Sequence, residues 1–276
     1  MPFSTLPEEK KPPDSSDYTN IYNQSTTDSY DTEEAHSNCG STVFSSVADN
    51  SSTSSGPEPP QVKPTVDRRF HPERMYPSHF TPDDIQVRRG ECVLLACPGS
   101  KRKCPHCNCH VCHTGCIVIA VDGACHRNGQ PGARASVGVY HGFESNWNAS
   151  YLLSSEENQT NQVAELVACE TALIDARLMH EYGEKYGIED RKLSIVVIKS
   201  DSEYVVRGMT EWIEKWKTNG WLNAKGQPVA NREYFFRIDG IVESLEKKYV
   251  SVKFWHVPRE LNKEADKLAK AALCEV

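Results

Sequence analysis

One stretch constrains the fold of this chain more than any other, the run 117–129. It opens with five consecutive apolar residues, which lead without a turn signal into Asp122 and then a glycine. Side chains alternate between the two faces of a strand, so Asp122 points the same way as Val118 and Ala120. A carboxylate on an apolar face needs a partner, a proton or a metal ion, because an isolated buried charge is very unfavourable. Taken alone, an Asp that opens a turn at a strand end is an equally good interpretation.

The first 66 residues have a different composition from the rest. They are crowded with Ser, Thr, Asn, Asp, Glu and Pro, and they hold ten acidic residues against three lysines, a net charge of −7. The whole chain also carries −7, so residues 67–276 are neutral overall. A segment so poor in large apolar residues cannot bury enough surface to offset its ordering entropy. We therefore predict a disordered acidic Ser/Thr-rich tail over 1–66, and the acidity does not argue against nucleic-acid binding by the folded part.

The N-terminus has neither an apolar signal-peptide core nor an Arg-rich transit pattern, and no apolar run approaches membrane-spanning length. We expect an intracellular monomer, in the nucleus or cytoplasm, with no membrane partner. In a reducing compartment, clustered cysteines more often bind metal than form disulfides.

Residues 67–115 form a Cys/His-rich extension whose first thirty residues have no clear pattern. Thiolate and imidazole are the ligands that a structural Zn²⁺ prefers, in a tetrahedral set. The spacing of Cys104, Cys107, Cys112 and Cys116 is close to that of a zinc knuckle. The alternative is an unligated Cys-rich linker.

From Cys116 onward, a regular alternation of elements favours an α/β layer architecture with a mixed sheet. Strands are expected over 117–121, 134–141, 148–154, 193–198 and 250–257, and helices from about Thr160, around 202–209, over 231–247 and over 262–273.

Four acidic residues occupy comparable places in this pattern. Asp122 and Asp201 end apolar strands, while Glu165 and Asp266 lie in helices. Clefts of α/β sheets form at strand ends and the tops of following helices. Carboxylates that converge there repel each other unless a divalent cation neutralises them, and all-oxygen ligands favour Mg²⁺ or Mn²⁺. Any one of the four, taken alone, is more simply an ordinary surface residue.

The segment from about Cys116 to Leu273 resembles a type 1 ribonuclease H. The motifs that carry the resemblance are Val121-Asp-Gly-Ala-Cys125, Asn128-Gly129, Thr160-Asn-Gln-Val-Ala-Glu165, Lys199-Ser-Asp-Ser202, Trp212-x3-Trp216-Lys-x-Asn-Gly-Trp221 and Asn262-Lys-Glu-Ala-Asp-Lys-Leu-Ala269. The resemblance implies a catalytic domain over 116–276 with a five-stranded mixed sheet flanked by helices. Its first three strands would be antiparallel and its last two parallel to the first. It also implies two-metal cleavage of the RNA strand of an RNA–DNA hybrid.

Residue by residue, the resemblance makes Asp122, Glu165, Asp201 and Asp266 the Mg²⁺-binding catalytic carboxylates. It makes Gly123 a substrate-binding residue and places Asn128, Asn161 and Gln162 at the hybrid's minor groove, where 2′-hydroxyls distinguish RNA from DNA. It places Thr160 and Asn231 near a phosphate pocket, and Trp212 and Trp216 along the DNA strand. The alternative for the two tryptophans is core packing, because aromatic residues four apart pack well on one helix.

The chain also departs from the family pattern. Many members have a longer loop before the last acid, with a mobile His that helps product release; here 257–262 is short and has none. The leading hypothesis is a hybrid-specific endonuclease. Its rivals are a catalytically silent nucleic-acid-binding module, a nuclease for double-stranded RNA or a structured hybrid, and a protein-interaction scaffold acting through the acidic tail.

Overall fold

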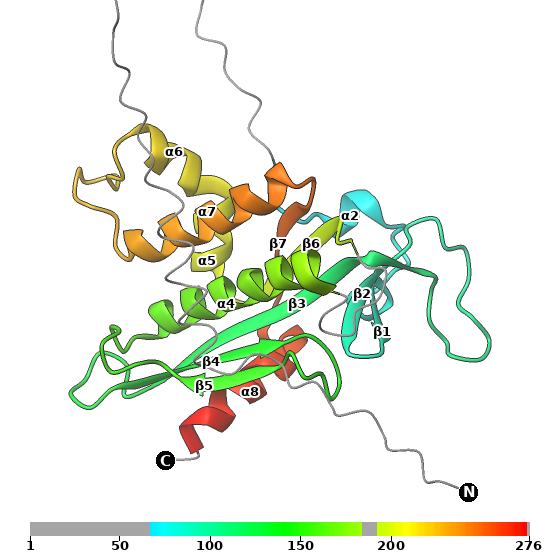
Figure 1. Cartoon of the computed structure of the whole chain (residues 1–276), viewed down its shortest axis with the longest axis horizontal. Helices are drawn as coiled ribbons and strands as arrows, with labels where there is room; N and C mark the ends of the chain where they lie inside the picture. The colour runs from blue at the N-terminus through cyan, green and yellow to red at the C-terminus, as the bar shows by residue number, and fades with distance from the viewer. Residues whose placement is uncertain (1–66, 184–191, 275–276) are drawn as a thin grey trace, which may run out of the picture. The chain divides into compact units, whose positions relative to one another are not determined.

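The computed structural model describes residues 67–183 and 192–274, and a mixed sheet organises them (Figure 1). Three successive strands are antiparallel, and two later strands lie parallel to the first of them on its other side. This is the predicted five-stranded arrangement, which is confirmed. The strands are β3 (Cys112–His126), β4 (Arg134–Tyr140), β5 (Ala149–Leu152), β6 (Ile195–Ser200) and β7 (Ser251–His256).

Two further strands, β1 (Gln86–Arg89) and β2 (Cys92–Ala96), extend the sheet to seven. β2 pairs with the first half of β3, at Val93 and Val118, and β4 pairs with its second half, from Ala120 onward. Because β6 occupies the other edge of β3, β2 and β4 follow one another along the same edge. Residues 67–115, set apart by sequence as an extension, thus belong to the same compact unit as the later strands.

Helices cover both faces of the sheet. Gly123 pairs with Val137, and a Cβ at Gly123 would lie 2.3 Å from the backbone N of Glu165 in α4 (Asn161–Tyr182). Gly138 pairs with Asp122, and a Cβ there would lie 2.3 Å from the backbone O of Ala265 in α8 (Lys263–Cys274). Because successive residues of a strand point to opposite faces, α4 and α8 lie on opposite sides of the sheet, with Asp122 on the α8 side.

The remaining helices follow β6 and lie on the α4 side, where α7 packs against α4 (Figure 1). They are α5 (Glu203–Arg207), the π-helical segment η2 (Gly208–Trp212), α6 (Ile213–Thr218) and α7 (Arg232–Lys247). A short 3₁₀ turn, η3 (Arg259–Leu261), leads from β7 into α8. All four helical regions expected from the sequence are present.

The extension contributes a second part of the core, together with its short helices α2 (Pro72–Met75) and α3 (Pro82–Ile85). The Phe70 ring lies 5.2 Å from that of Trp255, and the Tyr76 hydroxyl donates a hydrogen bond of 2.8 Å to the backbone O of Ala96. These rings and the apolar side chains of β1 and β2 pack on Val118 and Val197 of the central strands. The extension therefore covers apolar sheet surface that α8 leaves open.

Residues 68–70 also fasten the extension to the far edge of the sheet. Their backbone brackets Phe254 of β7, with hydrogen bonds of 2.9 Å from Phe70 N and 2.8 Å to Arg68 O. The buried Arg68 guanidinium pairs with Asp239 at 2.6 Å and Glu246 at 3.0 Å, both on α7. A buried charge is tolerated when it is paired and hydrogen-bonded in this way.

The predicted tail over 1–66 lies outside the described residues. Among the residues that are described, no helix is both long and apolar enough to cross a membrane.

Candidate active site

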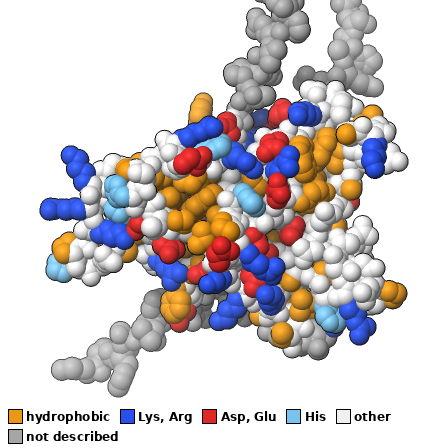
Figure 2. All heavy atoms as spheres, turned by 180° about the vertical axis from the view of Figure 1, so that it is seen from behind, with side chains coloured by type: hydrophobic (Ala, Val, Ile, Leu, Met, Phe, Trp, Pro, Cys, Tyr) orange, Lys and Arg blue, Asp and Glu red, His pale blue; other side chains and the backbone are white. Residues whose placement is uncertain are grey.

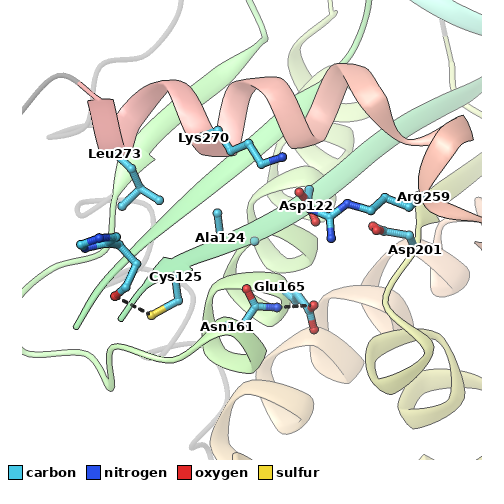
Figure 3. Close-up of a pocket in the computed structure, with 11 residues that line it drawn as sticks. Asp122, Ala124, Cys125, Asn161, Glu165, Asp201, Arg259, Lys270 and Leu273 are labelled. Atoms are coloured by element: carbon cyan, nitrogen blue, oxygen red, sulfur yellow. Dashed lines mark hydrogen bonds between the residues drawn. The ribbon is translucent and has the colours of Figure 1, made fainter. Parts of the chain in front are cut away.

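A cavity of about 300 Å³ opens where β3, β6, α4 and α8 meet (Figure 3). Its lining includes three of the four predicted carboxylates, Asp122, Glu165 and Asp201. Three residues of β3 next to Asp122, 123–125, form part of its wall. The fourth acid, Asp266, does not line the cavity, but two residues that bind it, Arg259 and Lys270, do.

The absence of a side chain at Gly123 brings the first two carboxylates together. The start of α4 lies directly over this residue, so close that any Cβ would overlap Ala164 and the Glu165 backbone. Thr160 begins the helix, since its hydroxyl accepts a hydrogen bond of 3.2 Å from Val163 N. Glu165 therefore stands in the second turn of α4, beside the residue that follows Asp122. Gly123, predicted as a substrate contact, has this packing role as well.

Asp122 lies on β3 and is buried, with 7% of its surface exposed. Burial, and then the negative charges of the three other carboxylates, raises its pKa to about 7. The three other acids are therefore close enough to Asp122 to act on it electrostatically. In the absence of a cation they are a crowded set of like charges.

Glu165 is held in place by two hydrogen bonds. Asn161 donates its side-chain amide to Glu165 Oε1 at 2.7 Å, and the Ser202 hydroxyl donates to Oε2 at 2.6 Å. Burial raises the Glu165 pKa, and these two donors partly offset the effect. Ser202 also begins α5, so one residue fixes both that helix and the carboxylate.

Asp201 follows β6 and is bound by Asn262, which is fully buried. The Asn262 side-chain amide donates 2.8 Å to Asp201 Oδ1 and 2.9 Å to the backbone O of Val121. One side chain thus joins the end of β6, the strand that carries Asp122, and the loop before α8.

Asp266 is enclosed by cations. Arg259 donates to one carboxylate oxygen at 2.7 Å and Lys270 to the other at 2.8 Å. Partial burial raises the Asp266 pKa, but the two donors outweigh it and leave the pKa below its usual value. Arg259 comes from η3, in the short loop between β7 and α8.

The donor chemistry of this site fits Mg²⁺ or Mn²⁺. The carboxylates supply only oxygen, which is the preference of these hard cations, and burial followed by the charges of the neighbouring acids raises the pKa of Asp122. Within 67–183 and 192–274, no three Asp, Glu, His or Cys side chains already surround a common metal position. The four carboxylates thus have the right chemistry to bind these cations. Asp266 forms ion pairs with Arg259 and Lys270.

The predicted hybrid-contact residues surround the start of α4. Asn128, in the loop after β3, accepts a hydrogen bond of 3.2 Å from the backbone N of Asn161, and Gln162 is exposed on the first turn. Asn231 begins α7 in a left-handed conformation, with φ 56°, and its amide donates to the Tyr204 hydroxyl at 3.3 Å. These positions remain predictions as substrate contacts.

The starts of α4 and α7 are linked by a hydrogen bond from the Tyr234 hydroxyl to Glu157. Thr160 follows Glu157 by three residues, and Asn231 precedes Tyr234 by three residues. Both are predicted phosphate-pocket residues. Two helix N-termini that meet in this way present backbone N–H groups and favour an anion.

Trp212 and Trp216 are half-buried, and their rings lie 5.6 Å apart. Trp216 also contacts Phe235 edge-on at 5.0 Å and stacks on Trp221 at 6.1 Å. The two tryptophans therefore form part of an aromatic cluster that joins η2, α6 and α7 and still has exposed surface.

The structure does not support the predicted zinc site. Cys116 is buried on β3 in the core that the extension shares, with its thiol 3.5 Å from the Ser194 hydroxyl. Cys104 and Cys107 are instead exposed in the connection between β2 and β3. The strand period explains the difference, because Cys116 shares its face with Val118 and not with that connection.

Three residues with clear roles in the geometry were given no role by sequence reasoning. They are Ser202, Asn262 and Arg259. Ser202 is adjacent to Asp201, and Asn262 lies four residues before Asp266. Both belong to motifs quoted above, so their place in those motifs could have indicated a role at the site. Arg259 carries no such signal, because its role depends on how the short loop turns.

Comparison with known proteins agrees with this geometry. A family model described as RNase H matches residues 115–274. Ribonuclease H1 of Mus musculus is 31% identical over 158 residues, which are 56% of this chain and 49% of that protein. Ribonuclease H of Salmonella arizonae is 32% identical over 156 residues, 56% of this chain and 88% of that protein.

The chain thus spans about half the length of the mammalian relatives it matches. Among solved structures, LC11-RNase H1 in complex with an RNA/DNA hybrid is 25% identical, covers 57% of this chain and 96% of its own, and has a TM-score of 0.39.

Proposed function

This chain belongs to the RNase H family, and from that premise we propose that it is a ribonuclease H that hydrolyses the RNA strand of RNA–DNA hybrids. The observation that carries the proposal is that three carboxylates, from β3, α4 and the end of β6, line one cavity, with a fourth, from α8, near enough to act electrostatically on Asp122. Binding of nucleic acid alone does not require such a set, because carboxylates repel phosphate. A reaction that uses divalent cations does.

Asp122, Glu165, Asp201 and Asp266 are the residues that would hold Mg²⁺, with Mn²⁺ as a substitute. When bound, a pair of such ions stabilises the attacking and leaving oxygens of a phosphodiester. The protein's own contribution is positioning: Asn161 and Ser202 fix both oxygens of Glu165, and Asn262 fixes Asp201. Side chains held by packing and hydrogen bonds keep a site in its productive geometry.

Substrate recognition is assigned to the residues around the start of α4. Gly123, Asn128, Asn161 and Gln162 are proposed to contact the hybrid where its 2′-hydroxyls are displayed, which distinguishes RNA from DNA. Thr160 and Asn231 are proposed to bind a phosphate, and Trp212 and Trp216 to lie along the DNA strand, stacked against its sugars or bases.

One observation favours a second candidate, a weakly active or silent hybrid-binding module. Asp266 is already neutralised by Arg259 and Lys270, so this carboxylate must exchange partners before it can hold a cation. The same two basic residues could instead contact a phosphate of the substrate.

Cleavage of an end-labelled RNA–DNA hybrid in Mg²⁺ tests the proposal, beside duplex DNA, duplex RNA and each single strand. The expected result is cleavage of the hybrid's RNA strand alone, lost in EDTA and in Asp201→Asn, which keeps the shape of the side chain and removes its charge. Tight hybrid binding without cleavage would support the silent module. Cleavage of duplex RNA at a similar rate would contradict hybrid specificity.

A further inference from the structure

The connection between β2 and β3, residues 97–111, carries a net positive charge that the catalytic site does not use. The chain has no acidic residue from 92 to 121, while Lys101, Arg102 and Lys103 stand together in this interval. We call residues 97–111 the basic connection. At the left of Figure 2, where the basic connection lies in that view, Lys and Arg side chains protrude from the surface.

The basic connection is anchored at its base. Cys97 N donates to Val111 O at 2.6 Å, which continues the pairing of β2 with β3. The Ser100 hydroxyl binds His110 Nδ1 at 3.1 Å, and the buried His110 ring stacks on Phe80 at 4.2 Å. Its two sides are therefore joined by hydrogen bonds and fixed to the folded extension.

The outer turn is ordered by a second set of bonds. Cys104 N donates to Cys109 O and Asn108 N to Cys104 O, each at 2.8 Å. Asn108 has a positive φ of 51°, which Asn tolerates better than most residues. The basic residues thus stand between a fixed base and a closed turn.

Only part of this charge is neutralised within the protein. Lys103 pairs with Asp84 of α3 and so tethers the basic connection. Lys101 and Arg102 are exposed, and in the part of the chain that the structure describes their side chains have no ion-pair or hydrogen-bond partner. Lys101 and Arg102 therefore form an unpartnered basic pair.

We propose that Lys101 and Arg102 bind the phosphate backbone of a nucleic-acid duplex whose other part lies in the active site. Cys112, at the base of the basic connection, pairs with Ala96, whereas Ile117 pairs with Leu94, so the irregular stretch between them advances by only two strand residues. With the five residues from Ile117 to Asp122, the span corresponds to about 23 Å. A duplex with one base pair per 3.4 Å spans that distance in about 7 base pairs. This identification of the duplex as a hybrid rests on the proposed function.

The test compares binding of a hybrid of about 24 base pairs with one of about 6, which is too short to reach both sites. The full chain and its Lys101→Ala/Arg102→Ala variant are titrated with each hybrid in Ca²⁺ at several salt concentrations. The matched control is Lys247→Ala/Lys192→Ala, which removes two exposed lysines elsewhere. Cleavage of the short hybrid in Mg²⁺ is measured in parallel.

We expect the variant to bind the long hybrid roughly tenfold more weakly at low salt, with a salt dependence shallower by about two released ions, since each phosphate contact contributes a slope of about 0.9. The short hybrid should bind and be cleaved as by the unaltered chain, and the control variant should match the unaltered chain throughout. An equal loss on both lengths, or no loss on the long hybrid, overturns the proposal. If no hybrid is cleaved by any form while the length dependence persists, the proposed activity fails and the accessory surface stands.

Discussion

The side-chain amide of Asn262 lies 2.8 Å from Asp201 Oδ1, and so the loop before the last helix holds a carboxylate that belongs to a central strand end. The same amide donates to the backbone O of Val121, one residue before Asp122. No water is needed to satisfy these acceptors, because a single buried group serves both. Asn262 is thus a positioning residue for two of the four acids.

We predict that Asn262→Ala lowers the free energy of unfolding by about 1–3 kcal/mol, because the buried backbone O of Val121 and the partly buried carboxylate of Asp201 lose their donor. Activity on a hybrid should fall further than stability explains, since Asp201 loses its orientation. Thermal unfolding and kcat, measured on the same preparation, check this. Asn146→Ala, which alters an exposed asparagine, is the control and should change neither.

The raised pKa of Asp122 predicts a stability that depends on pH. This carboxyl is protonated below about 7 in the folded protein, but only below about 4 when unfolded. Its contribution to stability is therefore fully present below pH 4 and is lost as the pH rises to about 7. In EDTA, the free energy of unfolding should fall over this window by up to a few kcal/mol.

Chemical denaturation between pH 4 and 8 measures this change. Asp122→Asn should flatten the profile, because the amide does not titrate, and Mg²⁺ should restore stability at pH 8 by neutralising the cluster. A wild-type profile in EDTA that rises steadily from pH 5 to 8 would falsify the burial argument for Asp122.

Arg259→Ala tests the role of the Arg259 guanidinium, which binds Asp266. If Arg259 contacts the substrate, the variant loses activity at all Mg²⁺ concentrations. If Arg259 mainly occupies Asp266, the variant reaches half-maximal activity at a lower Mg²⁺ concentration, because the carboxylate is freed. A Mg²⁺ titration of initial rates separates these outcomes, and Arg232→Ala, at an exposed helix start, serves as the control. Since Arg259 contacts only Asp266 within the structure described, its removal should shift the melting temperature little.

Two truncations should behave in opposite ways. Removal of residues 1–66 should leave folding and cleavage nearly unchanged, because the shared core begins at Phe70. Removal of residues 1–115 should be strongly destabilising, because it uncovers Val118, Val197 and Trp255 and leaves Asp239 and Glu246 without Arg68. Circular dichroism melts of the two forms would decide, and equal stability would contradict the shared core.

Trp216→Ala separates the two interpretations of the aromatic cluster. Loss of a nucleotide contact weakens binding by about 1–3 kcal/mol and leaves the melting temperature in place. Loss of core packing reduces stability by about 3–5 kcal/mol. Because Trp216 is half-buried, we expect both weaker hybrid binding and lower stability, with a raised KM as the larger effect. A lower melting temperature with an unchanged KM would contradict this, and Phe236→Ala, at an exposed ring on α7, provides the comparison.

The sequence predicted the order of the strands and the four carboxylates because both depend on local patterns. Apolar runs of strand length and an acid at their ends, as at Asp122 and Asp201, are visible without a structure. Thr160 as the start of α4 follows from the same kind of signal. The same residues belong to the motifs that resemble type 1 ribonuclease H. The family resemblance and the local sequence patterns therefore led to the same prediction.

The parts that were missed depend on distant contacts. Nothing in residues 86–96 shows that they pair with the first half of β3, since an apolar strand does not encode its partner. Cys116 and Cys112 were grouped with Cys104 and Cys107 by spacing, although Cys116 lies in the core and Cys112 packs against it, whereas Cys104 and Cys107 are exposed. Arg259 reaches Asp266 only because η3 turns the loop toward α8, and a short polar loop carries no pattern that predicts such a turn.

The segment 68–70 has one more consequence, which concerns association between molecules. Its bonds to Phe254 occupy backbone groups on the outer edge of β7, where an open strand would otherwise present unpaired N–H and C=O groups to a neighbouring chain. A fragment cut to the family-matching residues 115–274 would lose this cover. Such a fragment should form sheet-mediated aggregates as its concentration rises, whereas a form that begins at Asp67 should stay dispersed, and light scattering would distinguish the two.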